Sequence, residues 1–161
     1  MDNKLMTFEN AAFGKIRTLT IDGEPWFVAV DVCRALEIGN PTDAMRRLDA
    51  DERTLVSIEG ASNGLPVNAV NEPGLYTLIL GSRKPEAKAF KRWITHEVIP
   101  AIRKYGGYMT KSLLEQVLEN PNLIYEFARR MLAEQQKNER LRQELDRAKP
   151  KADYYDAFIH P

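Results

Sequence analysis

The sequence of 161 residues contains one cysteine and two histidines, and this scarcity excludes several kinds of site. Cys33 alone cannot form an internal disulfide or a cysteine-rich metal cluster, which fits a reducing cytoplasm and a small buried side chain. His96 and Glu97 begin like the zinc motif HExxH, but Pro100 stands where the second histidine is required. Neither glycine-rich phosphate motif, GxxxxGK[ST] or GxGxxG, occurs. The sequence therefore predicts no catalytic residue, no metal site and no cofactor.

Long apolar runs and net charge are also missing. No run approaches the roughly 20 residues that a membrane helix needs, and the first 15 residues lack the pattern of a secretory signal. The 23 basic and 23 acidic residues cancel, but residues 82–108 hold seven basic and only two acidic side chains. We therefore expect a cytoplasmic protein with no membrane partner, whose local charge decides what it binds.

Residues 82–108 also carry the strongest helical pattern of the N-terminal half. Their apolar residues recur at spacings of three and four, which predicts one helix with an apolar stripe facing a core. Pro85 suits the first turn and Gly106 the stop. Pro100 lies inside the pattern, where it removes a hydrogen bond at a cost of about 3 kcal/mol and predicts a kink or a break. We expect this helix to support the elements around it.

Two hairpins are predicted before this helix. Asp22-Gly23 between β-rich runs is a strong hairpin signal and predicts strands at 15–21 and 26–30, although imperfect alternation does not say which face is buried. Residues 55–58 and 65–70 predict two more strands, separated by the loop 59–64, and a buried helix follows at 72–80. The expected fold over residues 1–108 is α+β: small antiparallel hairpins packed with short helices and one long kinked helix.

Two short helices lie between the hairpins. Asp31 is predicted to cap a helix that Gly39 stops, and Asn40 to cap a second helix over 41–49. A helix, a glycine turn and a second helix resemble the helix-turn-helix arrangement, with the loop 59–64 as a wing. The same pattern equally fits two structural helices beside a plain exposed loop.

The C-terminal part, residues 109–149, is predicted to be a helical linker and coiled coil. A short helix is predicted at 113–120. From Ile124 to Ala148, six of eight seam positions with three-four spacing are apolar, and Asn138, at an a-type position, fixes the register and favours a two-stranded coiled coil. The expected dimer contacts are Ile124, Phe127, Met131, Asn138, Leu141 and Leu145. The alternative is a helix that folds back on its own domain. Pro150 is predicted to end the helix, and residues 150–161 to begin another folded segment that is truncated here.

Three blocks of the sequence resemble the N-terminal domain of BRO proteins, found in phage antirepressors and in baculovirus-type repeated genes. They are residues 23–32 (GEPWFVAVDV), residues 71–76 (NEPGLY), and residues 82–85 (SRKP) with Phe90, Trp93, Pro100, Ile102 and Arg103. The resemblance covers about residues 8–108. Residues 148–157 (AKPKADYYDA) also resemble the beginning of the antirepressor C-terminal domain. The resemblance implies nucleic-acid binding and, for phage members, relief of repressor control; it carries no catalytic residue.

The hypothesis from these observations is a prophage antirepressor-like transcription regulator, a homodimer in the bacterial host cytoplasm. The basic residues expected to bind DNA phosphates are Arg46, Arg47, Arg83, Lys84, Lys88, Lys91 and Arg92, while Asn40 and Thr42 are expected to contact base edges. The alternative is a protein-interaction module that binds and inactivates a phage repressor without touching DNA.

Overall fold

The computed structural model describes residues 6–10, 13–58 and 65–159, and the chain divides into two compact units, residues 1–108 and 109–161. The first unit contains all the described strands. The second contains only helices in its described part. The loop 59–64, the predicted wing, lies outside the described residues.

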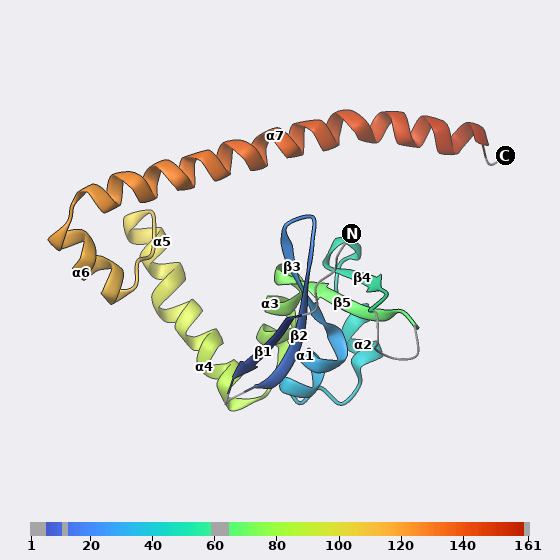
Figure 1. Cartoon of the computed structure of the whole chain (residues 1–161), viewed down its shortest axis with the longest axis horizontal. Helices are drawn as coiled ribbons and strands as arrows, with labels where there is room; N and C mark the ends of the chain where they lie inside the picture. The colour runs from blue at the N-terminus through green and yellow to red at the C-terminus, as the bar shows by residue number, and fades with distance from the viewer. Residues whose placement is uncertain (1–5, 11–12, 59–64, 160–161) are drawn as a thin grey trace. The chain divides into compact units, whose positions relative to one another are not determined.

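The first unit is built on one antiparallel sheet with the strand order β1-β2-β3-β5-β4 (Figure 1). Its strands are β1 (Met6–Asn10), β2 (Gly14–Ile21), β3 (Glu24–Val28), β4 (Arg53–Val56) and β5 (Val67–Asn71). Asp22 and Gly23 both have positive φ angles, 52° and 83°, as the favoured two-residue hairpin turn requires, so the first predicted hairpin is confirmed. Pairing of β3 with β5 joins the hairpins, and β1, which the sequence pattern did not predict, adds an edge beside β2.

Both faces of this sheet carry a buried cluster, which explains why β2 and β3 alternate imperfectly. Ile16 and Val70 lie in the cluster that includes the helices. Leu19, Val28 and Ala69 lie in a second cluster, formed by strand residues and by Ile58. A strand buried on both sides has no polar face to mark its period.

Four helices contribute to the first cluster: α1 (Ala29–Ala35), α2 (Pro41–Arg46), α3 (Glu72–Gly81) and, through Ala87, α4 (Pro85–Trp93). The sequence predicted two helix caps in this region, of which one is confirmed and the other is wrong. The side chain of Asn40 accepts the Asp43 N–H at 3.1 Å and caps α2 as predicted. Asp31, however, lies inside α1, and α1 ends before Gly39 because Glu37 takes the left-handed conformation, with φ of 56°. The predicted cap at Asp31 and stop at Gly39 were therefore wrong.

Asp31 instead joins α1 to β2 through a buried carboxylate. It is 2% exposed, and its two oxygens accept from the Arg17 guanidinium at 2.7 and 2.9 Å and from the Arg17 backbone N–H at 3.0 Å. Arg34 adds a weaker ion pair at 3.5 Å. A buried carboxylate with this many donors is held in its charged form and orients the helix that carries it.

The long helix is continuous but changes its winding before Pro100. It comprises α4 (Pro85–Trp93), the π-helical segment η3 (Ile94–Val98) and α5 (Ile99–Tyr105), and Gly106 ends it with φ of 82° as predicted. In η3 the Ile99 N–H bonds to the carbonyl of Ile94, five residues earlier, so the wider turn accommodates the proline.

The apolar stripe of the long helix was expected to face a core along its whole length, but in the structure it does not. Ala87 is 1% exposed, but Ile102 is 50% and Tyr105 83% exposed. Only the start of α4 therefore joins the core, and the sheet with α1 and α3 is the support of the domain.

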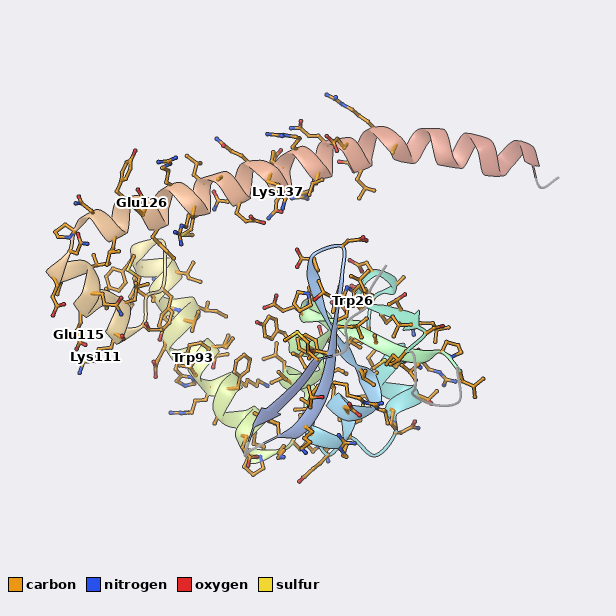
Figure 2. The ribbon with its side chains drawn as sticks, in the orientation of Figure 1. Trp26, Trp93, Lys111, Glu115, Glu126 and Lys137 are labelled. Carbon is orange, nitrogen blue, oxygen red and sulfur yellow. The ribbon has the colours of Figure 1, made fainter. Side chains whose placement is uncertain are left out.

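The second unit contains α6 (Lys111–Glu119) and α7 (Asn122–Ile159). Lys111 and Glu115 form an ion pair of 3.8 Å along α6 (Figure 2). The prediction that Pro150 ends the helix was wrong, because α7 continues through it. One carbonyl, that of Asp146, loses its N–H partner there, and because Asp146 is exposed, water can replace that partner. No helix in the described part of the chain is long and apolar enough to cross a membrane.

Replacement of Asp31 by asparagine should lower the free energy of unfolding by about 2–3 kcal/mol, because it leaves the Arg17 guanidinium without its anionic partner. Asp43→Asn is the matched control: its ion pair with Arg47 is exposed and should contribute less than about 0.5 kcal/mol. Urea unfolding measures both. Equal losses in the two variants would contradict a special role for the buried pair.

The contribution of Asp31 should also depend on pH. Burial alone would raise the pKa of this carboxyl, but the hydrogen bonds and charge of Arg17, with the charge of Arg34, hold the pKa below its usual range. A depressed pKa stabilises the fold fully above the unfolded pKa of about 3.9 and loses this effect as the pH falls through the folded pKa. The difference in unfolding free energy between the wild type and Asp31→Asn should therefore be constant above about pH 5 and shrink below about pH 4. Urea titrations across this range test it, and a difference that stays constant under acid would contradict it.

Candidate nucleic-acid interface

The helix α2 presents a short polar surface. Ala44 and Met45 are buried, and this places Thr42, Arg46 and Arg47 on the exposed side. The Arg53 guanidinium donates to the carbonyl of Met45 at 2.8 Å and satisfies the end of the helix. Arg46 is left exposed beside it.

Two of the polar residues on this surface already have intramolecular partners. The Oδ1 of Asn40 accepts the Asp43 N–H, while both of its amide N–H groups remain to donate to a base edge. Arg47 pairs with Asp43 at 2.7 Å, one turn away along the helix. Because this ion pair is exposed, it contributes little to stability and a phosphate can compete for the guanidinium.

The start of α4 is tied to the end of α1. The Ser82 hydroxyl donates to the carbonyl of Leu36 at 3.0 Å, and the Lys84 ammonium donates to the carbonyl of Ala35 at 2.9 Å. These are carbonyls at the C-terminal end of a helix, where a positive charge is favoured. Arg83 lies between the two anchoring residues and is itself exposed.

A cleft of about 210 Å³ lies between α2 and the end of α3, next to the start of α4. It is lined by Asn40, Asp43 and Arg47 from α2 and its cap, and by Thr77 and Gly81 from α3. Gly81 precedes Ser82 and Arg83 directly. The basic residues of α2 and those at the start of α4, about 40 positions apart in the sequence, therefore belong to one region of the surface.

The basic face of α4 extends this region. Lys88, Lys91 and Arg92 follow the spacing of three and four that places side chains on one side of a helix. Phe90 lies on another side of the helix, and Ala87, one turn before Lys91, is buried. Within the described part of the chain, Arg46, Arg83 and these three residues form no ion pair or side-chain hydrogen bond, so their charges are available.

Aromatic side chains on the other side of α4 pack against one another and against α3. Phe90 lies 6.1 Å from Tyr76 of α3 and 5.7 Å from Trp93, measured between ring centroids. Trp93 in turn meets Tyr108 edge-on at 5.7 Å, and its indole N–H donates to the Tyr108 hydroxyl at 3.3 Å. These contacts hold the basic face in a fixed orientation relative to α3.

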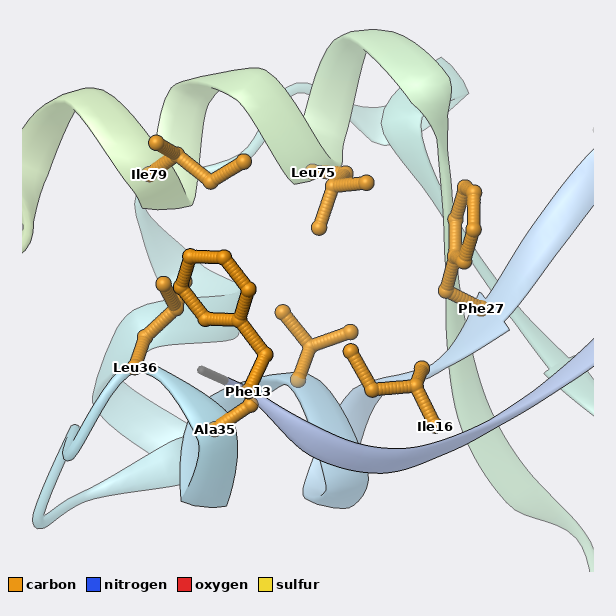
Figure 3. A pocket seen from close by; sticks show the side chains of 8 residues that line it. Phe13, Ile16, Phe27, Ala35, Leu36, Leu75 and Ile79 are labelled. Carbon is orange, nitrogen blue, oxygen red and sulfur yellow. The ribbon is translucent and has the colours of Figure 1, made fainter. Parts of the chain in front are cut away.

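One hollow of the domain has an entirely apolar lining and contains no group that could catalyse a reaction or bind a metal ion. Its volume is about 260 Å³, and Figure 3 shows Ile16 and Phe27 from the sheet facing Leu36 of the α1 end and Leu75 and Ile79 of α3 across it. No polar side chain lines it. It is a loosely packed part of the core.

No catalytic arrangement is found in the part of the chain that the structure describes. Burial raises the pKa of the Cys33 thiol, which disfavours the nucleophilic thiolate. Among the described residues, no three histidine, cysteine or acidic side chains are grouped to hold a metal ion. The polar features of this domain are its basic surface and its internal ion pairs.

The structure sorts the predicted DNA contacts into two groups. All of them except Lys84 are exposed. Thr42, Arg46, Arg83, Lys88, Lys91 and Arg92 form no side-chain hydrogen bond or ion pair among the described residues, while Asn40, Arg47 and Lys84 have the internal partners described above. The carbonyl that Lys84 binds belongs to Ala35, 49 positions away, so no local pattern could reveal this contact.

Comparison with known proteins gives one family and several relatives. The family model described as BRO family, N-terminal domain, matches residues 15–100. An uncharacterized protein of Haemophilus influenzae is 38% identical over 89 residues, which cover 53% of this chain and 43% of that protein. The putative Bro-N domain-containing protein 019R of Invertebrate iridescent virus 3 is 28% identical over 137 residues, covering 63% of this chain and 34% of that protein. This chain thus spans less than half the length of these relatives, and no solved structure matches it.

Replacement of Lys84 by methionine should reveal a structural lysine. The variant loses a charged hydrogen bond to the end of α1 and a contact of the ammonium with the Phe13 ring, 5.4 Å from its centroid, so we expect the free energy of unfolding to fall by about 1–2 kcal/mol. Lys88→Met removes the same charge from an exposed position and should change stability by less than about 0.5 kcal/mol. Equal urea midpoints for the two variants would contradict the anchoring role.

Proposed function

This chain belongs to the BRO family through its N-terminal domain, and on that premise we propose that it is a transcription regulator of the phage antirepressor type whose N-terminal domain binds DNA. The family is associated with DNA-binding regulators of phages and viruses. The proposal extends to the bacterial host cytoplasm as its location and to residues 150–161 as the beginning of an antirepressor C-terminal domain.

The observation that carries the proposal is the meeting of two basic segments at the end of α1. Ser82 and Lys84 fix the start of α4 there, and α2 begins five residues after Leu36. The phosphate contacts are Arg46, Arg83, Lys88, Lys91 and Arg92, with Arg47 released from Asp43 on binding. Thr42 and the amide N–H groups of Asn40 are the contacts to base edges.

The helix α7 supplies the dimer in this proposal. Ile124, Phe127, Met131, Leu141 and Leu145 are between 38% and 58% exposed, although they repeat every three and four residues along one side. Burial of this seam against a second copy removes apolar surface from water. Two linked DNA-binding domains gain affinity over one because the second contact becomes intramolecular.

A protein-interaction module is the second candidate function. A basic surface also suits an acidic repressor, and the antirepressor type acts on a repressor. Fluorescence anisotropy with a random DNA duplex at low salt separates the two, since a module that binds only protein gives no signal change.

DNA binding should weaken steeply as salt rises, because each neutralised phosphate releases counterions. Replacing Lys88, Lys91 and Arg92 by alanine should reduce the slope of log affinity against log salt by about 2–3, at about 0.9 per phosphate. The matched control removes three charges elsewhere, with Arg129, Arg140 and Arg147 of α7 replaced by alanine. A slope that falls equally in both triple variants would show that net charge, not the α4 face, determines binding.

The α2 surface has its own test. The double variant Arg46→Ala/Arg47→Ala should lose at least about tenfold in affinity, corresponding to about 1.4 kcal/mol, because two phosphate contacts disappear. Arg103→Ala/Lys104→Ala, at the far end of α5, is the control and should lose much less. Unchanged affinity in the first double variant would exclude α2 from the interface and with it the helix-turn-helix hypothesis.

A further inference from the structure

The polar residues in the seam of α7 point to one arrangement of the dimer. We propose that two copies of α7 pair antiparallel, in a register centred on Gln136, with Glu134 of each copy facing Asn138 of the other. The inference rests on the proposed dimer and adds the orientation and register, which the apolar residues alone do not determine.

The seam has two kinds of position. Written as a heptad, the a positions are Ile124, Met131, Asn138 and Leu145, and the d positions are Phe127, Glu134, Leu141 and Ala148. All eight lie on one uninterrupted helix and are exposed in the single chain. Two of the eight, Glu134 and Asn138, are polar, and they stand next to each other near the middle.

A parallel pair brings identical residues together. Asn138 would then face its own copy, which is favourable, but Glu134 would face Glu134 of the second copy across the seam. Two carboxylates held together across the seam repel each other, and neither can donate a hydrogen bond to the other. On the flanks, Lys137 at a g position would face Arg142 at an e position of the second copy, twice in the dimer.

An antiparallel pair places each a position opposite a d position of the second copy. In the register centred on Gln136 the facing residues are Ile124 with Ala148, Phe127 with Leu145, Met131 with Leu141, and Glu134 with Asn138. Every apolar residue meets an apolar one. Each carboxylate meets an amide that can donate a hydrogen bond to it.

Neighbouring registers lose this match. A shift of one heptad in one direction places Asn138 against Phe127 and Glu134 against Met131. A shift in the other direction places Asn138 against Leu141 and Glu134 against Leu145. Both shifts bury polar groups without partners, and this is the penalty by which a polar seam residue fixes register.

The flanking charges favour the same arrangement. In the antiparallel register, Arg130 lies beside Glu144 of the second copy, and by symmetry the pair occurs twice. The unfavourable contact within residues 123–148 is Lys137 with its own copy, once, at the two-fold axis, where exposed ammonium groups can turn away into water. The parallel arrangement has two unfavourable flanking contacts and the carboxylate pair.

The orientation determines how far apart the two copies of α7 begin. The two copies of Ile124 lie at opposite ends of the antiparallel pair, about 36 Å apart at 1.5 Å per residue. In a parallel pair they would lie about 10 Å apart.

Cysteine cross-linking tests the orientation in the full chain. Phe127→Cys and Leu145→Cys are made separately, since the residues face each other across the antiparallel seam. Each variant is oxidised alone and after mixing and refolding with the other. Cys33 is fully buried, so the wild type is the control without a cross-link. Arg129→Cys mixed with Gln143→Cys, on the outer face, controls for random collision.

We expect no cross-link in either variant alone and cross-linking of about half of the mixture as the heterodimer, because a disulfide needs Cβ atoms about 4 Å apart. Intact mass identifies the pair. Cross-linking of each variant alone would establish a parallel dimer and overturn the inference while the dimer itself stands. A monomer mass by light scattering, with no cross-link in any mixture, would overturn both the dimer and its proposed orientation.

Discussion

The buried carboxylate of Asp31 is the constraint on which the N-terminal domain depends. Its hydrogen bonds to the side chain and backbone of Arg17 hold α1 against β2, and a charge this deep in the core tolerates only that orientation of the helix. The end of α1 then provides the carbonyls that receive Ser82 and Lys84, and the chain leaves it towards α2. The candidate surface is therefore positioned by a helix that contributes none of its proposed DNA contacts.

Charge has two separate uses in this neutral domain. Arg17, Arg53 and Lys84 satisfy a buried carboxylate or the carbonyls at helix ends, and their positive charge is already compensated. Lys88, Lys91 and Arg92 stand on an exposed helix face that aromatic contacts hold in place. Only the second group has uncompensated charge with which to bind the phosphates of a polyanion. This division lets a chain of zero net charge present a cationic surface while most of its acidic residues lie elsewhere.

Local chemistry determined the parts of the fold that the sequence predicted correctly. Asp22-Gly23, Asn40 as a cap and Gly106 as a stop each act within four residues, so their outcome could be inferred from the sequence. Distant partners determined the rest: Asp31 became a core ion pair because Arg17 lies opposite, and Lys84 became an anchor because α1 ends beside it. The prolines show the same limit. Pro100 is accommodated by a π-helical turn and Pro150 lies within an exposed helix, and neither outcome follows from the intrinsic preference of proline.

In α7, one set of residues makes the segment helical, and another set would specify its pairing in the proposed dimer. Helix-forming residues such as Glu, Gln, Arg and Leu dominate it and make it helical without any tertiary contact. Its apolar seam supplies attraction but accepts both orientations of a second copy, since every arrangement of leucine, methionine and phenylalanine buries similar area. In the proposed dimer, Glu134 and Asn138 weaken that seam but discriminate between the arrangements, because only one orientation and register gives each a partner of opposite hydrogen-bonding character. The polar residues that would reduce the stability of such a pair are thus the ones that would determine its orientation and register.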